Sequence, residues 1–256
     1  EIASCLVGSE MCIRDRLGGT DPAAKVLFAT HLLSASVMAV PGSIVLAKML
    51  CPQTEEATDH VAISGKEKEN SNILDAISSG TVTGVKLMTN IAAMLLVFIS
   101  LVALANYITE GVIGRYTGLN DWIVKITDGK AQGLTFQFIL GVITSPFMWL
   151  IGVPSQDIML VGSLLGQKTI LNEFVAYFQL QQWKDAGLFM YEKSILMSTY
   201  ILCGFANISS IGILLGGLGV LAPEKRGLIS RIGLPAMIGG ALVSVLSATI
   251  IGMILG

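Results

Sequence analysis

Residues 26–47 contain no Asp, Glu, Lys or Arg, and this run restricts the fold more than any other feature of the sequence. A helix of this length can cross about 30 Å of hydrocarbon. Backbone polar groups at that depth must be satisfied within the protein, which favours helices. Of the whole chain, 53% is hydrophobic and 13% is charged. These values indicate an all-α, multi-pass membrane protein with the bilayer as its solvent.

Further charge-poor segments divide the chain into expected elements. Residues 1–16 fit neither a signal peptide nor a span, and we interpret them as a non-native tail ahead of a membrane region at 17–256. Glycine and proline interrupt the middle of the chain, which predicts an interfacial helix and then a re-entrant hairpin with short arms. The expected spans lie near 26–50, 85–109, 194–222 and 232–255, with the interfacial helix near 134–153 and the hairpin near 155–183.

Composition and motifs exclude several function classes. The formal net charge of -2 and the pI near 5.7 give no basic surface for nucleic acid. The 4 cysteines have no CxxC spacing, so no zinc site or disulfide framework is implied. The sequence has no HExxH, GxSxG or P-loop motif. We therefore expect no enzyme and no cofactor, and the sequence names no metal ligands.

Two polar clusters lie inside this apolar sequence and indicate a binding site. Glu173 follows Asn172 in NEFVAY, and Asn207, Ser209 and Ser210 lie within GFANISSIG. Ionisable groups at membrane depth are costly and usually line a substrate or ion path. GFANISSIG lies in the middle of the expected span at 194–222, so we expect that helix to be unwound there. A carboxylate such as Glu173 can accept hydrogen bonds from two vicinal hydroxyls, as on a ribose.

Structural alternatives exist for each of these polar residues. Glu173 could pair with Lys168 or cap the second arm of the hairpin. Asn207 and Ser210 could form ordinary hydrogen bonds between helices, worth about 0.6 kcal/mol each. His31 could relay protons, although near the start of a span a headgroup-level or capping role is more common.

Three segments together carry a family resemblance. They are HLLSASVMAVPGSIVLAKMLCPQTEEA, GVPSQDIMLVGSLLGQKTILNEFVAY and MSTYILCGFANISSIGILLGGLGVLAPEKRG. They resemble the carboxy-terminal half of the concentrative nucleoside transporter (NupC-type) family, over almost all of 17–256. The combination of NEFVAY with GFANxSSIG is specific, because neither is a general membrane pattern.

The resemblance implies a fold and a function. The fold would be half of an inverted-repeat transporter, a helical bundle with a re-entrant hairpin and an unwound helix, assembled as a homotrimer in the bacterial inner membrane. The function would be nucleoside symport driven by Na+ or H+. The other half of the family's transporter holds most ligands of the coupling cation, so we expect this fragment not to transport alone.

The resemblance also implies residue roles. Glu173, Asn207 and Ser210 would hold the ribose, Phe205 would lie beside the sugar, and Asn172 and Ser209 would complete the site. Two other function classes remain open. One is a structural or assembly subunit of the membrane, and the other is an intramembrane enzyme with Glu173 as general base.

Overall fold

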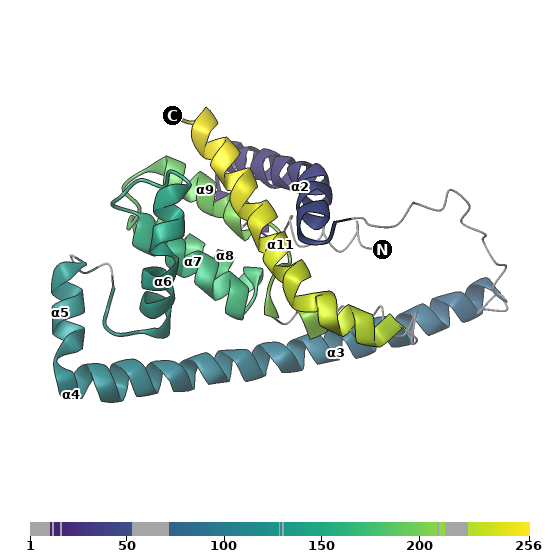
Figure 1. Cartoon of the computed structure of the whole chain (residues 1–256), viewed down its shortest axis with the longest axis horizontal. Coiled ribbons are helices and arrows are strands. Elements are labelled where there is room, and N and C mark those ends of the chain that lie inside the picture. The colour runs from purple at the N-terminus through teal and green to yellow at the C-terminus, as the bar shows by residue number, and fades with distance from the viewer. Residues whose placement is uncertain are drawn as a thin grey trace.

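The protein is helical throughout the part described by its structure, a computed structural model that covers residues 11, 13–15, 17–52, 72–127, 129, 131–208, 210–212 and 225–256. Figure 1 shows the order and arrangement of the helices. Their bounds are α2 Pro22–Leu50, α3 Ile73–Asn106, η1 Tyr107–Gly114, α4 Arg115–Thr117, α5 Leu119–Ile126, α6 Phe136–Leu150, α7 Ile158–Ile170, α8 Glu173–Asp185, α9 Glu192–Leu202 and α11 Arg226–Ile254.

Helices α2 and α11 are the longest apolar elements that pack on each other. Asp21 begins α2 by accepting a hydrogen bond from the backbone N–H of Ala23 at 2.9 Å, and a proline follows at the first helical position. Among the described residues, α2 and α11 are the two helices long and apolar enough to cross a membrane, judged by length and composition. Most of the large apolar side chains on α2 are exposed.

Helix α3 begins earlier than the span that the sequence predicts near 85–109. Asn72 caps it by accepting from the N–H of Asp75 at 2.9 Å, so the helix runs unbroken from Ile73 to Asn106. The sequence suggests a short helix at 73–77 and an exposed connection at 110–130. The structure instead continues from α3 through η1 and α4, with α5 after them (Figure 1). The helical conformation can continue because no proline interrupts this part of the chain.

Two asparagines connect this arm to the start of α6. The side-chain oxygen of Asn106 accepts from the N–H of Phe136 at 2.7 Å, and that of Asn120 accepts from the N–H of Leu134 at 2.9 Å. Both bonds satisfy backbone donors next to the first turn of α6, where no intrahelical partner exists. Helix α6 lies where the sequence predicts an interfacial helix, near 134–153.

Helices α7 and α8 are joined at Leu171 and Asn172 and contact each other. Each helix has 13 residues and is therefore roughly 20 Å long, which is less than the ~30 Å of a hydrocarbon core. Asn172 begins α8 by accepting from the N–H of Val175 at 2.9 Å. The hairpin predicted near 155–183 lies over these two helices.

The loop that leads from α8 into α9 is held by a buried acid, Asp157. Its carboxylate accepts from the N–H of Met190 at 3.0 Å and from that of Tyr191 at 3.1 Å. Asp157 also immediately precedes α7, so the first turn of the hairpin and the start of α9 are fixed to each other. Tyr177 adds a second connection by donating to the carbonyl of Thr199 at 2.8 Å.

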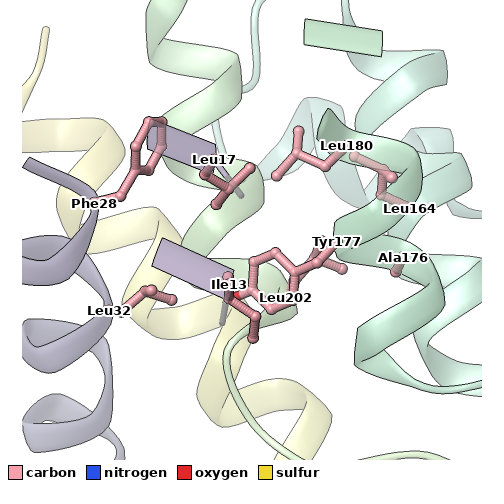
Figure 2. Packing of buried hydrophobic residues seen from close by; sticks show 9 residues of the cluster. All are labelled: Ile13, Leu17, Phe28, Leu32, Leu164, Ala176, Tyr177, Leu180 and Leu202. Atoms are coloured by element: carbon pink, nitrogen blue, oxygen red, sulfur yellow. The ribbon is translucent and has the colours of Figure 1, made fainter. Parts of the chain in front are cut away.

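Buried apolar side chains join α2, α7, α8 and α9 around the hairpin. Figure 2 shows Leu17 and Ile13 between the α2 residues Phe28 and Leu32 and the α8 residues Tyr177 and Leu180. Ile13 and Leu17 are buried in the same cluster. The interpretation of residues 1–16 as a non-native tail stays a prediction, and residues 1–10 lie outside the described part of the chain.

Helices α6 and α7 approach each other closely at glycines. A Cβ atom added at Gly162 would lie 2.6 Å from Thr144 Oγ1 and 3.0 Å from the carbonyl oxygen of Gly141. Small residues at such contacts allow two helix backbones to approach closely. The contact fixes the first arm of the hairpin on α6.

We predict that Gly162→Ala destabilises the protein by about 1–3 kcal/mol, because the added methyl overpacks the contact between α6 and α7. Thermal unfolding of the purified chain in detergent measures this change. Gly84→Ala is the matched control, since an added Cβ at Gly84 of α3 meets nothing within 4 Å. Equal unfolding midpoints for the two variants would contradict the close packing.

Candidate functional site

A buried hydrogen bond joins the two polar clusters that the sequence singles out. Nδ2 of Asn207 donates to Oε2 of Glu173 at 2.9 Å. Glu173 is 4% exposed and Asn207 is 3% exposed. Glu173 is the first residue of α8, and Asn207 lies beyond the end of α9. The fold thus brings together residues that are far apart in the sequence.

The backbone around Asn207 is not helical. Helix α9 ends at Leu202, and helical residues resume at Ile208. We call the intervening residues 203–207 the α9 break. Gly204 lies within it at a φ of 120°, a conformation that a residue with a Cβ rarely adopts. The break allows the Asn207 side chain to leave the helix axis and reach Glu173.

Asn207 also begins the short helical segment after the break. Its Oδ1 accepts from the N–H of Ser210 at 2.8 Å, and its own N–H donates to Ser210 Oγ at 3.2 Å. The two residues therefore cap each other. With Oδ1 held by this cap, the amide nitrogen is directed at Glu173. Asn207 is fixed in the orientation in which it donates.

Phe205 and Ser210 line a cavity whose lining does not include Glu173 or Asn207. Phe205 is 45% exposed, and both residues line a largely apolar cavity of about 360 Å³ between α2, the α9 break and α11. Asn172 is buried at the tip of the hairpin, next to Glu173. Ser209, the last of the site residues expected from the sequence, lies outside the described residues.

Lys168 contacts backbone at the end of α9. Its Nζ donates to the carbonyl of Ile201 at 2.7 Å and to Ser244 Oγ at 3.0 Å. The Glu173–Lys168 ion pair offered as an alternative does not occur in the described part of the chain, where the recorded ion pair is Arg14–Asp15. Ser244 lies in GGALVSVLS on α11, and nothing in that apolar run marks it out before the fold is known.

His31 contacts Tyr200 rather than a helix terminus. Its Nδ1 lies 3.1 Å from the Tyr200 hydroxyl, and the two rings meet edge to face with centroids 5.7 Å apart. The pair connects α2 to α9 close to the break. A capping role does not apply to His31, because α2 begins at Pro22.

In the described part of the chain, the side chains around the site form no metal-binding cluster of His, Cys, Asp or Glu. No group of three or more His, Cys, Asp or Glu residues is close enough to hold an ion within the described residues. The described site consists of a carboxylate, Glu173, and an amide, Asn207, at the α9 break. Such groups suit a ligand with several hydroxyls, which both donate and accept hydrogen bonds.

Comparison with known families decides the identity of the chain. Residues 31–252 match the family model described as "Na+ dependent nucleoside transporter C-terminus". The chain belongs to the concentrative nucleoside transporter family. This family consists of membrane transporters and not enzymes, so the interpretation of Glu173 as a general base is set aside.

Curated relatives come from bacteria and mammals. An uncharacterized transporter of Haemophilus influenzae is 39% identical over 89% of this chain and 52% of its own length. Nucleoside permease NupC of Helicobacter pylori is 36% identical over 88% of this chain and 51% of its own length. Sodium/nucleoside cotransporter 1 of Rattus norvegicus is 38% identical over 88% of this chain and 35% of its own length. The chain thus spans about half the length of these bacterial relatives.

Solved structures of the concentrative nucleoside transporter CNTnw share the fold. The inward-facing, substrate-bound state matches with a TM-score of 0.73 and 33% identity, over 96% of this chain and 57% of that protein. A doubly substituted variant of CNTnw in an outward-facing state matches with a TM-score of 0.72 and 36% identity, over 88% of this chain and 51% of that protein. The all-helical architecture expected from the sequence is therefore confirmed at this level.

A reciprocal exchange tests the contact between the two clusters. We predict that Asn207→Asp destabilises the protein, because two carboxylates then face each other in a buried site, while the aspartate still caps the helix. The lost bond to a charged group is worth about 1.5–3 kcal/mol. Adding Glu173→Gln should recover most of this loss, since the glutamine amide can donate to the new carboxylate. Thermal unfolding of the single and double variants measures the coupling, and additive effects would contradict a direct contact.

Proposed function

We propose that this chain is part of a cation-coupled nucleoside symporter and holds the ribose-binding half of its substrate site. The observation that carries this proposal is the buried bond between Glu173 and Asn207. It presents a carboxylate and an amide side by side on two elements of the fold. The family membership supports the substrate class, because relatives are named as nucleoside permeases and cotransporters.

The chemistry of the pair suits a sugar with two neighbouring hydroxyls. The carboxylate of Glu173 accepts from hydroxyl groups, and the amide of Asn207 donates to a hydroxyl oxygen. Charge-assisted bonds of this kind are roughly twice as strong as neutral ones. A ligand that lacks the hydroxyls would donate no hydrogen bonds to the buried carboxylate of Glu173. The free-energy cost of those missing bonds makes the site selective.

The remaining residues have supporting roles in this proposal. Asn172 fixes the first turn of α8 and hence the direction of Glu173. Ser210 holds Asn207 through their mutual cap and contributes its hydroxyl near the ribose. Phe205 lies beside the sugar, and Ser209 completes the set by its position in the sequence.

In the membrane, α7 and α8 act as a re-entrant hairpin, and α9 with its break acts as an unwound helix. Arms too short to cross the bilayer and a helix interrupted at a glycine are the usual elements of a transporter binding site. Transport couples nucleoside entry to Na+ or H+, and one charge moved across 100 mV supplies about 2.3 kcal/mol. The working assembly is a homotrimer in a bacterial inner membrane.

Equilibrium binding tests the ribose role. We predict that the purified chain binds uridine at least about a hundredfold more tightly than 2′,3′-dideoxyuridine, because the analogue cannot replace two bonds to a buried charged group. Isothermal titration in detergent compares the two ligands. Equal affinity would remove Glu173 and Asn207 from ribose recognition.

A chimera tests transport itself. Residues 31–252 would replace the matching segment of the Helicobacter pylori NupC permease, which supplies the rest of the transporter. We predict uptake of labelled uridine by the chimera and its loss in Glu173→Gln, while the chimera still folds and assembles. Glu192→Gln is the control, because Glu192 is an exposed acid on α9. Cells that express residues 1–256 alone should show no uptake.

The same chimera separates a transport role from a purely structural one. If Glu173 only stabilises assembly, Glu173→Gln should lose its trimer on size exclusion together with its uptake. Full uptake by the Glu173→Gln chimera would contradict the proposal directly.

A further inference from the structure

The ammonium of Lys168, on α7, donates to oxygen atoms of two other helices, α9 and α11. Lys168 is fully buried near the end of α7. It donates to the carbonyl of Ile201 at 2.7 Å, in the last turn of α9, and to Ser244 Oγ at 3.0 Å on α11. Ser244 Oγ in turn donates to the carbonyl of Cys203 at 2.8 Å. The lysine and serine together satisfy two carbonyls at the α9 break.

This environment has the chemistry of a cation site. The last carbonyls of a helix lack intrahelical partners and carry the negative end of the helix dipole. In broken helices of transporters, such carbonyls and the ends of half-helices are the groups that coordinate a coupling cation. Backbone carbonyls and hydroxyls are the ligands that hard cations take. Here, a side-chain ammonium occupies the position.

The neighbouring backbone is built around this ammonium. A Cβ atom added at Gly204 would lie 3.0 Å from Ser244 Oγ and 4.0 Å from Lys168 Nζ. Gly204 also has the positive φ of 120°, so its conformation and its lack of a side chain both allow the break to pass over the pair. A buried ammonium costs several kcal/mol unless such partners surround it.

We propose that Lys168 is a tethered cation that fills a monovalent-cation position at the carboxyl end of α9. By holding the carbonyl of Ile201 directly and that of Cys203 through Ser244, it fixes the start of the α9 break and so positions Asn207 to meet Glu173. This part of the site then needs no ion from solution to keep its shape. The use of the positioned Asn207 for binding a sugar rests on the proposed function, whereas the cation position does not.

Removing the lysine side chain should convert the tethered position into one that a small free cation can fill. In Lys168→Ala, we expect the unfolding midpoint to fall by about 5 °C or more, since bonds to a charged group are lost. Methylammonium chloride should restore several degrees of this loss, whereas tetramethylammonium chloride at equal ionic strength should not. Lys193→Ala on α9 is the control and should respond equally to both salts.

Selective rescue by methylammonium supports the proposal, and the absence of a difference between the two salts overturns it. The measurement needs no nucleoside, so it can succeed even if the ribose role fails. If Lys168→Ala gives no folded protein in either salt, the unfolding midpoint of Ser244→Ala tests the proposal instead. Its midpoint should fall by about 5 °C relative to Ser247→Ala, which removes another buried serine hydroxyl on the same helix. Equal midpoints for the two serine variants would then overturn the proposal.

Discussion

Helix α9 ends inside the protein, and the polar backbone groups exposed there require partners. In water such groups are hydrated, but inside a protein each unsatisfied group costs several kcal/mol. The structure provides partners from both sides of the break. Lys168 and Ser244 take the carbonyls of Ile201 and Cys203 on one side. Ser210 and Asn207 satisfy each other on the other side. The interruption is therefore stable enough to serve as a site.

The same arrangement explains why the site contains both an acid and a base without an ion pair between them. Lys168 and Glu173 are close in sequence, yet they bond to different sides of the α9 break. Lys168 holds the end of α9, and Glu173 receives the amide that follows the break. A direct ion pair with Lys168 would occupy the Glu173 carboxylate, which we propose binds the sugar. Separate partners leave Glu173 directed by a neutral donor.

Sequence reasoning locates the polar clusters and the helical class, because both depend on local composition. The sequence also predicts a hairpin with short arms, but it offers Glu173 as the residue that caps the second arm, whereas the structure has Asn172 in that position. The partners of Lys168 could not be predicted, because Ser244 is one of several small residues in α11 and the carbonyl of Ile201 carries no sequence signal. The long start of α3 was missed for a different reason. Its polar first turns resemble a loop until the Asn72 cap is seen.

The most direct test of the Glu173–Asn207 site is a structure of the chimera with uridine bound. We predict that the ribose hydroxyl oxygens lie within about 3.2 Å of the Glu173 carboxylate and the Asn207 amide nitrogen. A nucleoside bound elsewhere, while Glu173 and Asn207 keep only each other as partners, would contradict this role.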